Sequence, residues 1–575
     1  MSGYHIGHAQ PVTMPTTPEA VQQADALIDS AFASVDADGH AHAAEVYLAL
    51  LAQLDRLLEP TEAEVVHRHL RQLTIVMPTA MQAQLGLDVW GEGHALPESE
   101  GIGARLVQWW RQQDGLPGTE NNERLEEHLR RVAHATNEYA HADDLRGFDD
   151  RGEIYVRLGI PTLRTSIENR SPELRMKPAH ARIPKNEFWV YDHIAHDAYY
   201  LFVQRSGRRP YHVTETAELL RHRDLDYMEE VLSQLAMKHT AFGNAYDAIT
   251  KYQTTSPRAT ASPSTRIAAQ ILADVRMQDS QHEYARSVEV PVAHSNTLGF
   301  RATLDVPMRW ARFLDPDGTT RTEVYWNLDL EALQPSKRLV RLLERQGQTP
   351  SERYLIGVAL AQHAADHQLR QVQRKHYLTS ATQTQQPVVT SVARGDTGRY
   401  HVALQWDQQW VVEDEGRLEP GVQLGVGVQR IDTLQALHGA GQRLEMSDLK
   451  PVRYQPDQLL ESADPYPHAQ WHAEDELALY FEVYHLAFTA NDETSYTIAY
   501  EVSRPGRKRL LAGRGADQLT TTAVSYQGQQ RTAQEYVAVD IADWNGQGEL
   551  NITIRVTDEV TGEQVSRDIT FSNAD

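Results

Sequence analysis

The chain has 575 residues, of which 41% are hydrophobic and 23% charged, and at about 150 residues per domain this length predicts three to five folded domains. The 79 acidic and 55 basic residues give a formal charge of −24, which disfavours nucleic acid and anionic lipid surfaces as partners. The sequence contains no cysteine, which excludes disulfides, thiolate nucleophiles and cysteine-ligated metal centres.

The N-terminal part of the chain is predicted to be helical. Residues 1–18 lack periodicity and predict a flexible tail. Residues 19–100 repeat Ala, Val and Leu at three- and four-residue spacing, which predicts a domain of helical hairpins that is loosely tetratricopeptide-like. The first 20 residues show no export signal, so either the chain stays inside the cell or its first residue is not that of the precursor.

Residues 101–290 predict an α+β domain. Residues 101–139 read as a helix, a Pro-Gly turn and a second helix capped by Thr119 or Asn121. Strand patterns follow in GEIYVRL, residues 152–158, and in an aromatic hairpin made of EFWVYDH and AYYLFVQ. Helical stretches at about 215–252 and 267–285 are separated by a predicted loop, TTSPRATASPST.

The C-terminal half predicts two β-sandwiches, at residues 299–455 and 470–575. Short segments that alternate apolar and polar residues recur between turn motifs such as DPDG. The stretch YQPDQLLESADPYPHAQ, rich in Pro, Asp and Gln, is predicted to link the two sandwiches.

The segment GFDDRGEIYVRLGIP, residues 147–161, is the most unusual in the chain because it places three acids and two arginines around a short apolar run. Three interpretations are open. Its charges could pair with one another and cap backbone groups in a turn. Alternatively, Asp150, Arg151, Glu153 and Arg157 could form a polar recognition site with aromatic walls, or the carboxylates could be catalytic.

Local roles follow from residue type. Gly152 and Gly159 are predicted to form tight turns at either end of the strand, and Pro161 to lead the chain out of it. Arg151 is predicted to bridge the turn carboxylates to the helix start at residues 121–124, so that its loss would destabilise the central domain.

No other segment predicts a reaction centre. His40 and His42 fit a solvated helix start better than a metal site, and DADGH and DPDG fit turns better than calcium loops. Nucleotide-binding glycine motifs and the nucleophile elbow are absent. The sequence therefore predicts no catalytic residue, no metal site and no cofactor.

Several segments together resemble the GWxTD-domain family of bacterial proteins. They are QWWRQQDGLPGTENNERLEEHLRRVAHATNEYA, GFDDRGEIYVRLGIP, EFWVYD with AYYLFVQ, and C-terminal blocks such as VPMRWARFLDPDGTTRTEVYWNL and ITIRVTDEVTGEQVSRDITF. The resemblance covers roughly residues 105–575. The family motif has Gly-Trp-x-Thr-Asp before Arg-Gly, a strand and Gly-x-Pro, whereas this chain has Phe for Trp and one residue fewer before Arg-Gly.

The matching positions supply the candidate binding residues. With the neighbouring Glu153 and Arg157, they are Gly147, Phe148, Asp150, Arg151, Gly152, Gly159, Pro161, Glu187 and Trp189. The resemblance implies helical repeats before the domain, immunoglobulin-like sandwiches after it and an exported location in the periplasm or cell envelope. It implies no reaction, because the domain has none established.

These observations predict a non-enzymatic binding or scaffold protein of the bacterial cell envelope that holds protein partners through helical and β-sandwich modules. The competing prediction is a hydrolytic or carbohydrate-active enzyme with Asp150, Arg151, Glu153 and Glu187 around a pocket. A cytoplasmic location remains open, because the resemblance implies export and the sequence shows no signal for it.

Overall fold

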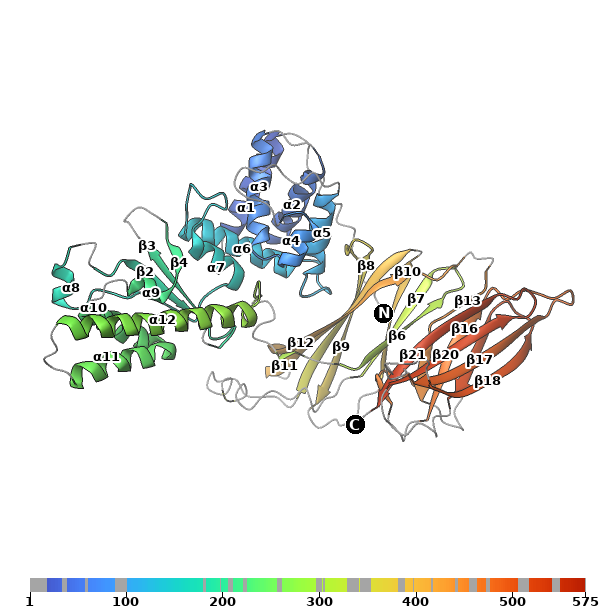
Figure 1. Ribbon diagram of the computed structural model, residues 1–575. Coiled ribbons are helices and arrows are strands. Elements are labelled where there is room, and N and C mark those ends of the chain that lie inside the picture. The colour runs from blue at the N-terminus through green and yellow to red at the C-terminus, as the bar shows by residue number, and fades with distance from the viewer. Residues whose placement is uncertain are drawn as a thin grey trace. The chain divides into compact units, whose positions relative to one another are not determined.

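The chain is described from a computed structural model (Figure 1). The described residues are 18–33, 39–56, 60–87, 101–178, 182–196, 198–204, 210–220, 225–255, 261–295, 302–303, 306–327, 341, 353–380, 388–396, 398–414, 417–439, 443–453, 463–471, 476–504, 517–539 and 549–573. They fall into two compact units. The β unit comprises the described residues after Phe300 with Leu116–Glu120, and the α/β unit comprises the others.

The α/β unit begins with helices, as predicted. They are α1 (Pro18–Ala33), α2 (His40–Ala52), the 3-10 turn η1 (Gln53–Asp55), α3 (Pro60–Thr74), α4 (Thr79–Gln84), α5 (Ile102–Gln112), α6 (Glu123–Glu138) and α7 (Asp150–Leu158). Their apolar faces form one core that also contains Trp189 and Phe202 of the sheet. The described residues of the predicted helical domain, 19–33, 39–56 and 60–87, therefore share their core with the predicted central domain instead of forming a domain of their own.

Two local predictions in these helices need correction. The cap of α6 is Asn122, whose side-chain oxygen accepts a 2.9 Å hydrogen bond from the Leu125 N–H, and not Thr119 or Asn121. His40 is buried, because its ring stacks on Phe32 at a centroid distance of 4.6 Å, whereas His42 is exposed as expected for a solvated helix start.

A four-stranded antiparallel sheet divides the α/β unit into two layers. Its order is β1-β2-β3-β4, from β1 (Leu163–Thr165), β2 (Lys185–Val190), β3 (Tyr199–Gln204) and β4 (His212–Thr214). The predicted aromatic hairpin is confirmed as β2 and β3, in which Phe188 pairs with Leu201. Because side chains alternate between the faces of a strand, Trp189 faces the α1–α7 core and Phe188 faces a second core.

The second core is covered by the helices that come after α7 in the chain. They are α8 (Pro172–Met176), α9 (Thr216–Leu219), α10 (Leu225–Lys238), the 3-10 turn η3 (Thr240–Phe242), α11 (Gly243–Thr255) and α12 (Ala261–Glu289). Helix α12 lies alongside α11 (Figure 1). The loop predicted at residues 254–265 is shorter than expected, because α11 reaches Thr255 and α12 begins at Ala261; residues 256–260 lie outside the described residues.

The first β-sandwich of the β unit packs two sheets around Trp326 and Trp406. One sheet has the order β10-β7-β6 and the other β5-β12-β11-β8-β9. The strands are β5 (Ala302–Thr303), β6 (Met308–Leu314), β7 (Thr320–Trp326), β8 (Arg353–Ala364), β9 (Leu369–Ser380), β10 (Val389–Asp396), β11 (Arg399–Asp414) and β12 (Arg417–Gln435). DPDG forms the predicted turn between β6 and β7, with Gly318 at φ +83°.

The second sandwich begins earlier than predicted. Its strands are β13 (Glu445–Met446), β14 (Lys450–Arg453), β15 (Gln470–Trp471), β16 (Leu477–Tyr484), β17 (Thr494–Arg504), β18 (Asp517–Gly528), β19 (Ala533–Ala538), β20 (Glu549–Asp558) and β21 (Gln564–Asn573). Strands β13 and β14 both pair with β16, which also pairs with β19. Tyr466, in the predicted linker, is 1% exposed and packs in this core. The predicted linker is therefore wrong for residues 463–470, and residues 454–462 lie outside the described residues.

These sheets and helices confirm a mixed α and β architecture, and the immunoglobulin-like identity of the sandwiches stays a prediction. Among the described residues, no helix combines the length and apolar composition that a bilayer-spanning segment requires.

Candidate functional site

Residues 150–158 form helix α7 and not the predicted strand. Asp149 caps it, because its carboxylate accepts a 3.0 Å hydrogen bond from the Arg151 N–H. Burial alternates along the helix, with Gly152, Ile154, Val156 and Leu158 buried. Residues two apart in an α-helix point about 200° apart, so this alternation places buried side chains on opposite sides of α7. A strand produces the same pattern in sequence.

The glycines and Phe148 of the predicted motif have structural roles. Phe148 is fully buried, and a Cβ atom on Gly152 would lie 2.5 Å from its ring, so the prediction of a turn at Gly152 is wrong and close packing explains the glycine. Gly147 (φ +89°) and Gly159 (φ +80°) adopt left-handed conformations that favour glycine. Gly159 does not form the predicted turn at the end of a strand, because it directly follows the end of helix α7, and its carbonyl accepts a hydrogen bond from Tyr191 Oη.

Arg151 joins α7 to the sheet through two carboxylates. Its guanidinium donates to Asp149 Oδ2 at 2.8 Å and to Glu187 Oε1 on β2 at 2.6 Å. The other oxygen of Glu187 accepts from Arg164 Nε at 2.8 Å and from Trp189 Nε1 at 2.9 Å. The predicted bridge from Arg151 to the turn carboxylates is confirmed for Asp149, but its distant partner is Glu187 and not residues 121–124.

Aromatic rings flank this network. The Arg151 guanidinium lies 3.8 Å from the centre of the Tyr211 ring and 5.0 Å from that of Tyr139. Arg164, on the more exposed side, lies 5.4 Å from the rings of both Tyr139 and Trp189. Cation–π contacts of this kind stabilise a partly desolvated guanidinium.

Asp150 and Glu153 belong to a neighbouring cluster around Arg146. Arg146 pairs with Glu153, with Asp144 at 2.8 Å and with Asp150 at 3.9 Å. Asp150 also accepts a 2.9 Å hydrogen bond from the Val213 N–H on β4. The two carboxylates proposed for catalysis on α7 therefore serve to connect it to the preceding turn and to the sheet edge.

The C-terminal end of α7 is held by an arginine that the sequence did not single out. Arg131 on α6 donates to the carbonyls of Val156 and Arg157 at 3.2 Å and to that of His294 at 2.8 Å, and pairs with Glu127. Arg157 itself donates to the Val292 carbonyl. The sequence signal for this contact is a Glu and an Arg four residues apart on α6. Solvent-exposed helices carry the same spacing, so it does not by itself identify a buried pair. Pro161 lies between α7 and β1 and makes no described polar contact with the network.

Asp150, Glu153, Arg151 and Glu187 thus belong to two neighbouring ion-pair networks, and no predicted site residue lines the cavity described next. A cavity of about 430 Å³ in the same unit is lined instead by Asp192, His196, Ala236, Met237, Lys238, His239 and Thr240. Comparison with known proteins supplies no relative, since neither a family model nor a curated protein matches the sequence. The resemblance to GWxTD-domain proteins therefore stays a prediction, and function must be argued from the geometry.

The Glu187 network predicts a pH dependence of stability. Burial by itself would raise the pKa of Glu187, but hydrogen bonds from Arg164, Trp189 and Arg151 outweigh it and lower the pKa below its usual range. A carboxyl with a lowered pKa adds stability above its unfolded pKa and loses it as pH falls through the folded pKa. We expect the unfolding free energy of the α/β unit to fall between about pH 5 and pH 3.

Hydrogen exchange of β2 and β3 in urea, followed by mass spectrometry at a series of pH values, measures this slope. Glu187→Gln should be less stable at pH 7 and should show a smaller loss on acidification. An identical pH slope in the variant and the unmodified chain would contradict the assignment.

Proposed function

We propose that the chain is a non-enzymatic binding or scaffold protein of the bacterial cell envelope, which holds protein partners through its helical and β-sandwich modules. The envelope location rests on the family resemblance. The binding role is supported by two features of the β unit, a bracing of its two sandwiches against each other and an uncharged sheet edge. The second feature carries the proposal.

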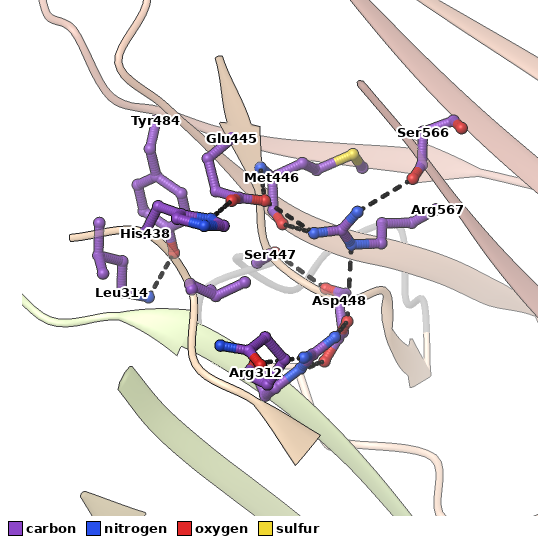
Figure 2. Close-up of polar contacts among 12 residues, drawn as sticks. Arg312, Leu314, His438, Glu445, Met446, Ser447, Asp448, Tyr484, Ser566 and Arg567 are labelled. Carbon is purple, nitrogen blue, oxygen red and sulfur yellow. Dashed lines mark hydrogen bonds and ion pairs between the residues drawn. The ribbon is translucent and has the colours of Figure 1, made fainter. Parts of the chain in front are cut away.

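The bracing centres on Asp448, which lies between β13 and β14 in the second sandwich. Arg312 on β6 of the first sandwich donates to it through its backbone N–H at 2.9 Å, Nε at 2.7 Å and Nη2 at 2.8 Å. Arg567 on β21 approaches the same carboxylate at 3.6 Å and binds Glu445 at 2.9 Å. Figure 2 shows Asp448 between the two guanidinium groups.

A second set of contacts extends the bracing. Lys450 pairs with Glu323 of the first sandwich at 3.3 Å. The Leu314 N–H donates to Tyr484 Oη at 2.9 Å (Figure 2). Phe313 on β6 packs against Tyr480 on β16. Multiple charged and apolar contacts favour a fixed arrangement of the two sandwiches, which suits a support that presents a binding edge in one orientation.

Strand β18 forms one edge of the larger sheet in the second sandwich. Its sequence, DQLTTTAVSYQG, has no charged residue after Asp517, and Val524 is 47% exposed. The edge strand β9 of the first sandwich differs, because it carries Arg370, Arg374 and Lys375. Charged residues, lysine above all, protect an edge from pairing with another strand. We infer that β18 binds an extended segment of a partner protein by strand addition.

The enzymatic alternative receives no comparable support. Asp150, Glu153 and Glu187 each pair with arginine, and none of them lines the 430 Å³ cavity of the α/β unit. A general acid or base must lie within hydrogen-bond distance of its substrate. The ion pairs with arginine hold these carboxylates in other contacts.

Site-specific photo-crosslinking in the native organism tests the proposal. The photoreactive residue replaces Val524 on β18 or, as the matched control, Leu378 on β9, which is 52% exposed. We expect position 524 to capture a partner protein through one extended segment, and a synthetic peptide of that segment to slow hydrogen exchange in β18 of the full chain. Val524→Lys should weaken the peptide's affinity about tenfold or more, and Leu378→Lys should leave it unchanged.

Equal capture at the two positions, or exchange protection by the peptide away from β18, would overturn strand addition at this edge. Capture of a second copy of the chain would show that the edge mediates self-association and would replace the partner protein proposed here.

A further inference from the structure

Two histidines and an aspartate meet at one end of the larger sheet in the first sandwich. His367 lies in the turn between β8 and β9, His401 lies near the start of β11, and Asp432 lies on β12. One ligand-type atom from each of the three side chains lies within 4.8 Å of the others. His401 Nδ1 is 3.5 Å from Asp432 Oδ1, and the two imidazole rings stack with centroids 3.8 Å apart.

Irregular backbone brings these residues together. Tyr400 pairs with Leu434 but Val402 pairs with Ile431, so His401 faces two residues of β12, Asp432 and Thr433. This β-bulge redirects the side chains beside it. Positive φ angles occur at Thr433 (59°) and at His367 (63°), a conformation that is uncommon for residues other than glycine and that is enriched at functional sites.

Neighbouring backbone groups determine which nitrogen of His401 carries its lone pair. Nε2 lies 3.3 Å from the Ala365 carbonyl, which can only accept, and Nδ1 lies 3.0 Å from the Thr433 N–H, which can only donate. The proton of the neutral ring is therefore on Nε2, and the Nδ1 lone pair lies on the side of Asp432. A histidine that binds a metal usually donates its other ring N–H to such a carbonyl.

The charges around the cluster include both signs. Asp366 and Asp432 place negative charge near His367. Arg430 places positive charge near the same ring, and His363 is a further imidazole beside it. Imidazole binds a metal ion through the lone pair of a ring nitrogen.

We propose that His367, His401 and Asp432 bind a divalent transition-metal ion of the Zn²⁺ type, with a remaining coordination position open to water or an outside ligand. Imidazole nitrogens with one carboxylate suit such ions, and three protein ligands leave a fourth position of a tetrahedral site. The open position fits the 60% exposure of the Asp432 side chain. Ligand atoms about 2.0–2.1 Å from zinc lie roughly 3.3 Å apart. Because an imidazole binds a metal in the plane of its ring and the two stacked rings are nearly parallel, the His367 ring must rotate out of the stack, and the ion replaces the Thr433 N–H at Nδ1 of His401.

Zinc titration of the full chain against a chromophoric chelator tests the site. We expect one Zn²⁺ per chain to bind with an affinity that falls at least about tenfold in His367→Asn and in Asp432→Asn. Asparagine tolerates the left-handed conformation at position 367 and is close in shape to aspartate at 432, so both variants should fold. His376→Gln, which changes a histidine of β9 outside the cluster, should bind as the unmodified chain does.

Spectroscopy with Co²⁺ provides a readout specific to the ligands. The unmodified chain and His376→Gln should give the visible absorption of a bound low-coordination Co²⁺ ion, and the two cluster variants should lose it. Zinc affinity that is unchanged in the cluster variants, or that falls only in His376→Gln, would overturn the proposal, as would the absence of any binding by the unmodified chain.

Discussion

Arg151→Ala is expected to lower the unfolding free energy of the α/β unit by about 3–5 kcal/mol, the range typical when one partner of a buried ion pair is removed. The Arg151 side chain is 13% exposed, and its partners Asp149 and Glu187 are 3% and 14% exposed. Without the guanidinium, the contacts described for Asp149 are backbone donors alone, and those described for Glu187 are Arg164 and Trp189. Two carboxylates would then be desolvated with weaker compensation.

Hydrogen-exchange protection of peptides from α7, β2 and β3 in the full chain measures this loss without interference from the β unit. Arg130→Ala, on an exposed position of α6, is the matched control and should change stability by no more than about 0.5 kcal/mol. Equal protection in the two variants would show that the network contributes no net stability.

Asp448→Ala is expected to destabilise the β unit by about 3 kcal/mol and to reduce the coupling between its sandwiches. The Asp448 side chain is 15% exposed and accepts three hydrogen bonds from Arg312. Without Asp448, the hydrogen-bond acceptor described for the Arg312 side chain is the Gln435 carbonyl, at 2.6 Å. A partly buried cation that loses its carboxylate destabilises the fold. Because Arg312 and Asp448 join the two sandwiches, the loss weakens the contact between them.

Calorimetry of the full chain follows this variant. The transition of the β unit should shift to lower temperature in Asp448→Ala and broaden or divide, because one sandwich can then unfold before the other. Asp568→Ala removes an exposed carboxylate of β21 that accepts only from Thr553 among its described contacts, and should leave the transition nearly in place. A uniform shift with no broadening would argue against coupling through Asp448.

The sequence predicts strands well where residue type and turns mark them. The aromatic hairpin β2 and β3 is identified by its aromatic and β-branched residues on either side of a short turn, although both of its faces are buried. Helix α7 was mistaken for a strand because its neighbours bury opposite sides of it, which produces alternation at helical geometry. The linker prediction failed for a related reason, since composition does not show that Tyr466 is buried.

The candidate sites differ in how far sequence could locate them. Arg151 and the capping role of the turn carboxylates were found because they lie within one short segment. Glu187 was found only through the resemblance, and its pairing with Arg151 depends on a sheet that brings together residues 36 positions apart. The cluster of His367, His401 and Asp432 had no local signal, because its three members lie on separate strands and turns and meet through a β-bulge.

The core shared by the N-terminal helices and the sheet limits how the chain can be divided. Trp189 and Phe202 on the sheet pack with residues from α1 to α7, and a Cβ atom on Gly103 in α5 would lie 2.8 Å from the backbone of Leu51 in α2. Exchange of residues 18–87 for another set of helices would leave α5 and α6 without the packing partners that they have in α1 and α2. These helices therefore cannot act as an interchangeable cassette, and recombination between related genes would preserve them only when they are inherited together with α5 and α6.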